Sequence, residues 1–276
     1  MTAPFAWMPY DPEYDTDPSA RPGMPMPYGL YAALWDRVGP EHTARIAELL
    51  RPSLELRPDV ADGEPGWTPV GRTGGAAAAL PPGVDWPQGD GHPMELLAQL
   101  DCAGLAEAFR AGLVGRPWPL PADGVLLFFH DSFPADSRDV SCLVLHTASE
   151  LPERPAPLDP DGVEPLPARP VRARWALSAP SYLDDELVDV LAGDHLAAMA
   201  VSDICHEHLG GAGIRLLGWC DSHNTTRPDG HRPLLQVEAS AVDASWGELV
   251  NVSVWITGED LTAGRPGRTR YGCEVA

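Results

Sequence analysis

The stretches GHPMELLAQLD (residues 91–101) and GHRPLLQVE (residues 230–238) follow one pattern in two distant parts of the chain. Each begins with Gly-His and ends with an apolar run, a glutamine, another apolar residue and an acid. Aligned on the glutamines, Gln99 lies over Gln236, and both stretches have the apolar character of a β-strand. We therefore expect the two stretches to be equivalent strands of a duplicated structural unit.

The segments around both stretches follow the same order. Each half contains a glycine turn, a strand that ends in the glutamine pattern, and then a strongly apolar strand. We expect strands over residues 94–101, 125–129, 140–146, 171–177, 214–220, 234–239, 250–257 and 268–275. We expect two short helices within 29–51, divided at Gly39-Pro40, and further helices over 105–113, 182–191 and 195–208. Asp194 is the expected N-cap of the last of these helices. The predicted fold class is α+β, with mostly antiparallel β-sheets, flanking helices and two pseudo-repeated β-rich halves.

Proline-rich segments divide the chain. Residues 1–28 hold seven prolines and predict an N-terminal arm without regular secondary structure. Residues 151–170 hold another seven and predict an extended connector between a first α+β half at 29–150 and a second at 171–276. The pattern leaves open whether this connector separates two domains or is a surface loop of one compact domain.

The charge of the chain limits the partners that it can have. Its 40 acidic and 19 basic residues give a net charge of −21. A field of that sign repels nucleic acids and anionic membranes, and it favours basic partners or cations. Every basic residue is an arginine. The missing lysines exclude a phosphate-binding loop and lysine Schiff-base chemistry.

The cysteine pattern and the N-terminal sequence indicate a cytoplasmic protein. The five cysteines are scattered, without a Cys-x-x-Cys pair, as is typical of reduced thiols in a cytosol. The N-terminal stretch MTAPFAWMPYDPEYDTD lacks the basic segment and apolar run of a secretory signal. No apolar stretch reaches about 18 residues, the length that a membrane-spanning helix needs.

Ordered motifs in both halves resemble one protein family. They are Gly74-Gly75, Leu80-Pro81, Trp86-Pro87 and Leu97–Leu100 in the first half, and Leu216–Trp219, Leu234–Gln236, Trp246-Gly247 and Val254–Ile256 in the second. This series is similar to the YwqG-like proteins, a bacterial domain of unknown function, over about residues 70–146 and 195–265. The segment after Gly218 departs from the family pattern, which usually has a proline and a glutamine there. The resemblance implies a compact α+β fold, and it implies no established activity and no catalytic residues.

The densest polar cluster does not have the spacing of a metal site. Residues 203–223 include the potential zinc ligands Cys205, His206, His208, Cys220, Asp221 and His223. His206 and His208 are two residues apart on a predicted helix, so their side chains point about 200° apart. Cys205 and His208 have a better spacing, but they are only two ligands. We expect no metal and no cofactor. The chain also lacks the Gly-x-Ser-x-Gly motif of a nucleophilic serine.

Five residues are the candidates for ligand binding: Trp86, Gln99, Trp219, Gln236 and His223. The two tryptophans follow a proline-rich loop or a glycine turn, and they either pack in the core or form the stacking walls of a cleft. The two glutamines either tie down loop backbone or grip a ligand across a pseudo-symmetric cleft.

Two functions remain open on the sequence alone. The first is a non-catalytic interaction protein that binds a basic protein partner, in the manner of an immunity protein or antitoxin. The second is an enzyme that acts on a small molecule in a cleft between the two halves. The sequence does not determine the oligomeric state.

Overall fold

The structure is a computed structural model that describes residues 26–89, 91–112, 118–131, 142–148, 151–221 and 227–275. The chain forms two compact units. The helical unit consists of the described parts of 1–52, 177–211 and 218–226, and the sheet unit consists of those of 53–176, 212–217 and 227–276. The expected N-terminal arm lies outside the described residues except for its last three, of which Tyr28 begins the first helix.

The helical unit contains α1 (Tyr28–Leu49), α3 (Asp185–Val190) and α4 (His195–Leu209), which share one apolar core. Gly39 has a φ of 77° inside α1, so this element is two short helices, as expected, with Pro40 in the first turn of the second. Asp194 accepts a hydrogen bond from the Ala197 amide at 3.0 Å, which confirms its expected role as the N-cap of α4. None of the described helices is long and apolar enough to cross a membrane.

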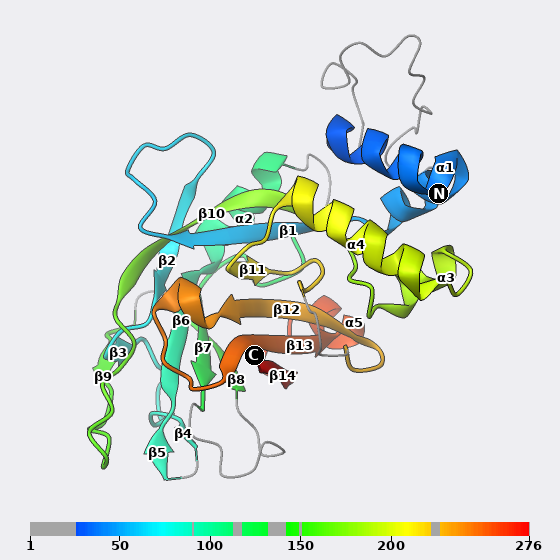
Figure 1. Ribbon diagram of the computed structural model, residues 1–276. Coiled ribbons are helices and arrows are strands. Elements are labelled where there is room, and N and C mark those ends of the chain that lie inside the picture. Colours follow the sequence, from blue (N-terminus) through cyan, green and yellow to red (C-terminus); the bar gives the residue numbers. More distant parts are fainter. Residues whose placement is uncertain are drawn as a thin grey trace. The chain divides into compact units, whose positions relative to one another are not determined.

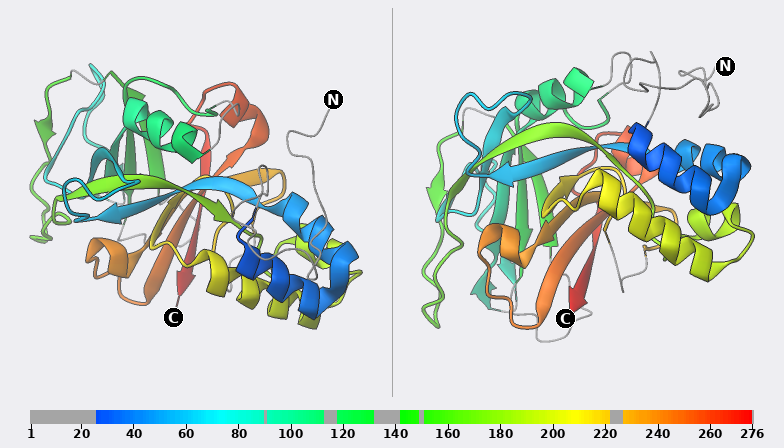
Figure 2. Two further views of the ribbon diagram at one scale, coloured as in Figure 1. Left: turned by 90° about the horizontal axis from the view of Figure 1, so that it is seen from above. Right: turned by 45° about the horizontal axis from the view of Figure 1, so that its top comes forward.

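The sheet unit is built on one ten-stranded sheet (Figure 1). In chain order its strands are β1 (Arg51–Pro58), β2 (Thr68–Thr73), β6 (Glu95–Asp101), β7 (Val125–His130), β8 (Cys142–Thr147), β10 (Arg169–Ser178), β11 (Ile214–Leu216), β12 (His231–Glu238), β13 (Leu249–Thr257) and β14 (Thr269–Val275). Their spatial order is β14-β13-β12-β11-β1-β10-β2-β6-β7-β8. The sheet curves so strongly that its two outer strands, β14 and β8, also lie beside each other (Figure 2). The fold class is therefore α+β with a mostly antiparallel, nearly barrel-shaped sheet, as expected.

Shorter elements complete the sheet unit. Helix α2 (Cys102–Gly112) packs against β2 and β6, and the short helix α5 (Gly258–Thr262) follows β13. A 3-10 helix, η2 (Ala239–Val242), follows β12. Two small antiparallel pairs join β3 (Ala77–Ala78) to β9 (Arg154–Pro155), and β4 (Gln88–Gly89) to β5 (His92–Pro93).

The strand registers confirm that the sheet is duplicated. Gln99 in β6 lies opposite Arg72 in β2, and Gln236 in β12 lies opposite Arg215 in β11. Strands β6-β7-β8 form one end of the sheet, and strands β12-β13-β14 form the other end in mirrored order. The two glutamines therefore occupy equivalent positions in two related units.

Local irregularities are repeated as well. The pairing of β6 with β7 shifts register at Leu97, and the pairing of β12 with β13 shifts at Leu234. The amide of Gly74 donates to the Leu97 carbonyl at 3.0 Å, and the amide of Leu217 donates to the Leu234 carbonyl at 2.9 Å. Gly74 and Leu217 both have a φ just above 60°, so the chain turns in the same way after β2 and after β11.

Several expected boundaries were wrong. The strand expected over 214–220 ends at Leu216, because Leu217 and Gly218 both adopt positive φ values. The helix expected over 182–191 is shorter, Asp185–Val190. Strands β1 and β2 were not expected at all, and β1 begins at Arg51, where the second helix was expected to end.

Candidate binding groove

Two adjoining pockets form a groove in the sheet unit. They share the residues Glu95, Val163, Glu164 and Pro165. The small pocket has a volume of about 30 Å³, and its apolar walls are Trp86, Met94, Leu96 and Pro157. The wide pocket has a volume of about 520 Å³, and it adds Leu166, Pro167, Asp243, Ser245 and Trp246. The groove thus takes residues from the first half, the connector and the second half.

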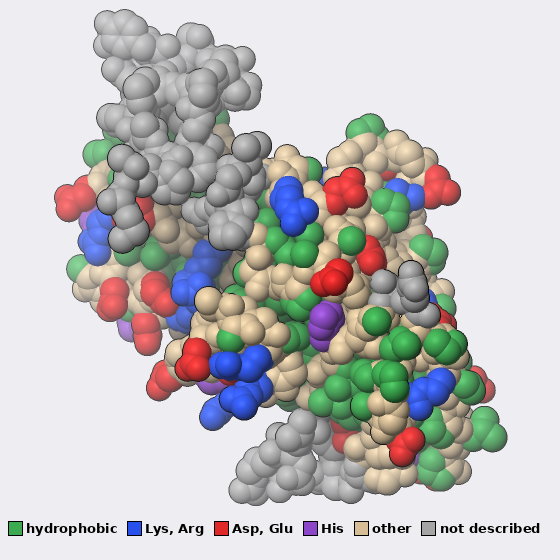
Figure 3. All heavy atoms as spheres, turned by 180° about the vertical axis from the view of Figure 1, so that it is seen from behind, with side chains coloured by type: hydrophobic (Ala, Val, Ile, Leu, Met, Phe, Trp, Pro, Cys, Tyr) green, Lys and Arg blue, Asp and Glu red, His purple; other side chains and the backbone are tan. Residues whose placement is uncertain are grey.

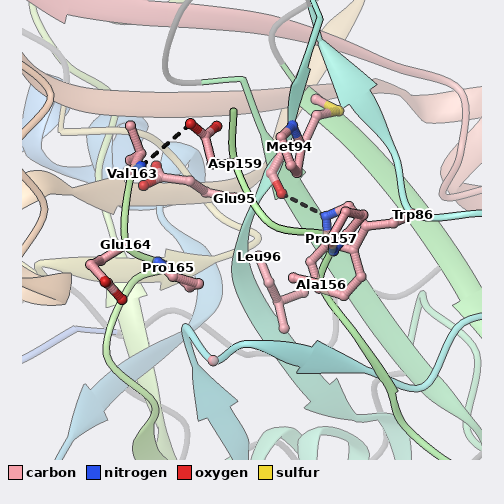
Figure 4. A pocket seen from close by; sticks show the side chains of 12 residues that line it. Trp86, Met94, Glu95, Leu96, Ala156, Pro157, Asp159, Val163, Glu164 and Pro165 are labelled. Atoms are coloured by element: carbon pink, nitrogen blue, oxygen red, sulfur yellow. Dashed lines mark hydrogen bonds between the residues drawn. The ribbon is translucent and has the colours of Figure 1, made fainter. Parts of the chain in front are cut away.

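Figure 4 shows how the side chains are arranged in the small pocket. The apolar residues Trp86, Leu96 and Pro157 lie on one side of the view, and the carboxylates Glu95 and Glu164 lie on the other together with Val163 and Pro165. The indole of Trp86 donates a hydrogen bond to the Met94 carbonyl at 2.9 Å, which holds the apolar wall in place. A ligand in this groove would meet an apolar surface and negative charge at the same time.

Glu95 is held by a side chain from the second half. The Trp246 indole, from the turn before β13, donates to the Glu95 Oε2 atom at 2.9 Å. His130 lies opposite Glu95 in the sheet and is fully buried. Its ring is 4.9 Å from the Trp246 ring and 5.6 Å from the Tyr271 ring, between centroids. These contacts fix the Glu95 carboxylate at the junction of the two pockets.

The connector forms one wall of the groove, and backbone contacts hold it against the first half. The Ala156 amide donates to the Ala76 carbonyl at 2.8 Å, and the Gly75 amide donates to the Leu166 carbonyl at 2.9 Å. A Cβ atom on Gly74 would lie 2.3 Å from the Pro167 carbonyl oxygen, so no larger residue fits there. The glycine turn is therefore required both for its φ and for the close approach of the connector.

The groove carries an excess of negative charge. Glu95, Asp159, Glu164 and Asp243 all line it, and no basic residue does among those that the structure describes. Asp243 forms an ion pair with Arg169 at 2.8 Å. No ion pair involves Glu164 in the part of the chain that the structure describes, and Glu164 is exposed. The arrangement favours a cationic ligand over an anionic one.

Of the four sequence candidates that the structure describes, only Trp86 lines this groove. Gln99 lies nearby: its Oε1 atom accepts from the Ala79 amide at 3.1 Å, and its Nε2 atom donates to Glu153 at 2.8 Å. The Arg72 guanidinium at 2.7 Å lowers the pKa of Glu153, burial opposes this effect, and the Gln99 amide adds to it. Gln99 therefore fastens loop backbone and the connector to the sheet.

Two other candidates lie elsewhere. Trp219, in the helical unit, is fully buried, and its indole donates to the Leu49 carbonyl at 2.7 Å under the Arg51 guanidinium. Gln236 is buried within β12. His223 lies outside the described residues. The sequence did not identify Glu95, Asp159, Glu164 and Asp243 as site residues, and the only signal for Trp246 was its place in the family pattern.

Three buried thiols are unreactive, and no metal cluster is found among the described residues. Burial raises the pKa of Cys102, Cys142 and Cys205 to about 12, so these thiols are protonated at neutral pH. No group of three or more His, Cys, Asp or Glu side chains among the described residues could hold a metal ion.

Comparison with known proteins places the chain in a family. Residues 71–274 match the family described as "Domain of unknown function (DUF1963)". Curated protein sequences give no match. The family match spans most of the chain, from β2 to β14, and includes every residue that lines the groove. The chain therefore belongs to the DUF1963 family.

Proposed function

We propose that this protein is a non-catalytic interaction module that binds a basic polypeptide segment in its acidic groove. The observation that carries the proposal is the groove itself, whose described lining has four carboxylates, no basic residue and apolar walls. An arginine side chain matches this chemistry, because its aliphatic stem packs on apolar surface while its charged end meets a carboxylate.

The distribution of charge supports a local site. On the face shown in Figure 3, acidic, basic and apolar side chains are interspersed, so the net charge of −21 does not form a uniform acidic surface there. The overall field attracts a basic partner and speeds its encounter, whereas the groove carboxylates determine where it binds. The protonated thiols of Cys102, Cys142 and Cys205 also support a non-catalytic role.

We further propose that the protein acts in the cytoplasm, that it is a YwqG-like member of its family, and that its partner is a basic protein neutralised in the manner of an immunity complex. The scattered cysteines and the motifs shared by both halves support these proposals.

A labelled nona-arginine peptide tests the groove. We expect the double variant Glu95→Gln/Glu164→Gln to bind this peptide about tenfold more weakly than the wild type, because each change removes a carboxylate from the groove. Glutamine at position 95 keeps an acceptor for the Trp246 indole, so the local structure is preserved. Fluorescence anisotropy at low and moderate salt measures the dissociation constant.

The matched control is Glu41→Gln/Glu48→Gln, which removes the same charge from exposed positions on α1. This variant should bind the peptide almost as tightly as the wild type. Equal weakening in both variants would show that the peptide responds to net charge alone, and the proposed groove would then be wrong.

A further inference from the structure

A histidine joins the β4-β5 pair to the connector. His92, in β5, lies with its Nδ1 atom 3.0 Å from the Asp159 Oδ2 atom and its Nε2 atom 3.8 Å from the Asp161 Oδ2 atom. The Asp159 side chain is only 7% exposed and lines the small pocket. The histidine therefore contacts a residue of the groove wall from outside the connector.

Asp159 also organises the connector around itself. Its Oδ1 atom accepts from the amides of Asp161 at 2.8 Å and Val163 at 3.3 Å, and its carbonyl accepts from the Gly162 amide at 3.1 Å. These bonds make a compact turn that leads directly to Val163, Glu164 and the rest of the wall shared by both pockets (Figure 4). A contact that holds Asp159 in place thus also positions Glu164.

Three carboxylates act on His92. Asp159 and Asp161 approach from the connector, and Asp131 approaches from the end of β7, where its side chain lies against Gly89. The hydrogen bond to Asp159 raises the pKa of His92 above its ordinary 6.5, burial opposes the rise, and the three negative charges add to it. Burial works to raise the pKa of Asp159, but its bonds from His92 and from the two amides leave it below the ordinary value.

The contact between His92 and Asp159 is strongest at low pH. Charged His92 binds the Asp159 carboxylate more strongly than neutral His92 does. The extra stabilisation is fully present below pH 6.5, and it is lost as the pH rises through the raised pKa of the folded protein. Asp159 stays ionised throughout this range, so His92 alone titrates within the pair.

We propose that His92 and Asp159 form a pH-sensitive clasp that fixes the connector wall of the groove when His92 is charged and loosens it when His92 is neutral. The regulatory meaning of the clasp rests on the proposed function of the groove. The clasp itself rests on the contacts of His92 and on the turn that Asp159 holds.

Hydrogen exchange of the wild-type protein tests the clasp directly. After correction for intrinsic rates, protection of the amides within 157–165 that donate to Asp159, those of Asp161, Gly162 and Val163, should fall severalfold between about pH 6 and about pH 8.5. His92→Gln is never charged at this position, so its protection should be low at both pH values and independent of pH. Unchanged wild-type protection, or the same pH dependence in His92→Gln, would overturn the clasp.

Two further measurements keep the proposal falsifiable if His92→Gln folds poorly. Asp161→Asn removes only the longer contact and should retain most of the pH dependence of protection. NMR titration of the wild-type imidazoles should show one that titrates above 6.5 together with the amides of 157–165. The absence of such an imidazole would also overturn the clasp.

Failure of the groove variants to weaken nona-arginine binding would contradict the proposed function, but it would leave the result of the hydrogen-exchange experiment unchanged.

Discussion

Gln99 shows how one side chain can connect three parts of a fold. Its amide joins the sheet, the Ala79 backbone and Glu153 of the connector within hydrogen-bond distance. A glutamine among apolar strand residues is informative, because a buried amide requires partners. The sequence identified the residue and offered loop attachment as one of its roles. It could not identify the partners, since Glu153 is 54 residues away along the chain.

Replacement of Gln99 measures the strength of this connection. We expect Gln99→Leu to lower the free energy of unfolding by about 1–3 kcal/mol, because the Ala79 amide would lose its acceptor. Gln88→Leu is the control: Gln88 is exposed, makes one longer bond at 3.4 Å, and should change stability by about 0.5 kcal/mol or less. Chemical denaturation measures both. Equal effects would show that the Gln99 contacts contribute nothing specific.

The site residues were harder to predict than Gln99. Glu164 and Asp159 lie in a proline-rich stretch with no periodic pattern, and they become groove residues only because the connector folds back onto the Gly74-Gly75 turn. Among the many acids of the chain, no local signal distinguishes Glu95 from the others. The net charge of the sequence thus favoured basic partners only in general terms, and the tertiary contacts of the connector determine where the groove carboxylates gather.

At the level of single elements, the equivalent strands β7 and β13 have diverged in chemistry. Val125 lies opposite Asp101 in β6, and Asn251 lies opposite Glu238 in β12, so Val125 and Asn251 are equivalent. Val125 belongs to an apolar cluster, whereas Asn251 is only 4% exposed. The Oδ1 atom of Asn251 has no hydrogen-bond partner in the part of the chain that the structure describes.

Two single variants test whether the buried polar side chain of Asn251 lowers the stability of the protein. Asn251→Val should raise the free energy of unfolding by about 1 kcal/mol or more, because it removes a buried acceptor without a partner. Val125→Asn should lower it by about 2 kcal/mol or more, because it places an amide in an apolar cluster. Thermal unfolding compares the two variants. A loss of stability in Asn251→Val would mean that the amide makes a structural contact, through water or otherwise.

Element prediction succeeded where the pattern was local and failed where pairing was distant. The unbroken apolar run of β7 and the Asp194 cap of α4 were both predicted correctly. Strand β2 reads TPVGRT and contains a proline and a glycine, which strands usually lack. Strand β1 has a proline near each end. Both strands are held by partners far away in sequence, β10 and β11, which local propensity cannot reveal.

In the whole chain, the duplicated halves are interlocked. The sheet order β11-β1-β10-β2 places β1 of the first half beside β11 of the second, and β10 of the second half beside β2 of the first. The first strand of each half therefore pairs with a strand of the other half: β1 pairs with β11, and β10 pairs with β2. The sequence predicted the repeat but not this exchange, because the alternating pattern of a strand specifies its faces and not its neighbours.

This pairing of strands between the halves predicts that neither half folds alone. Cleavage between the exposed residues Asp161 and Gly162 would give one fragment in which β1 and β2 lack β11 and β10, and another in which β11 and β10 lack β1 and β2. Each fragment would leave unpaired strand edges and exposed apolar side chains such as Leu54 and Leu216, which are now fully buried. We therefore expect no cooperative unfolding transition for either fragment by circular dichroism.

Mixing the two fragments should restore the transition, since every strand then regains its partner. A protease site inserted at the same position provides the control, because the native protein cut there should remain assembled and keep its spectrum. If the separated fragments show no cooperative transition, the cause is then the missing partner strands and not the broken connector. A cooperative transition in the isolated second fragment would mean that β11–β14 fold without β1. The exchanged strand β1 would then have been added to a half that could already fold by itself.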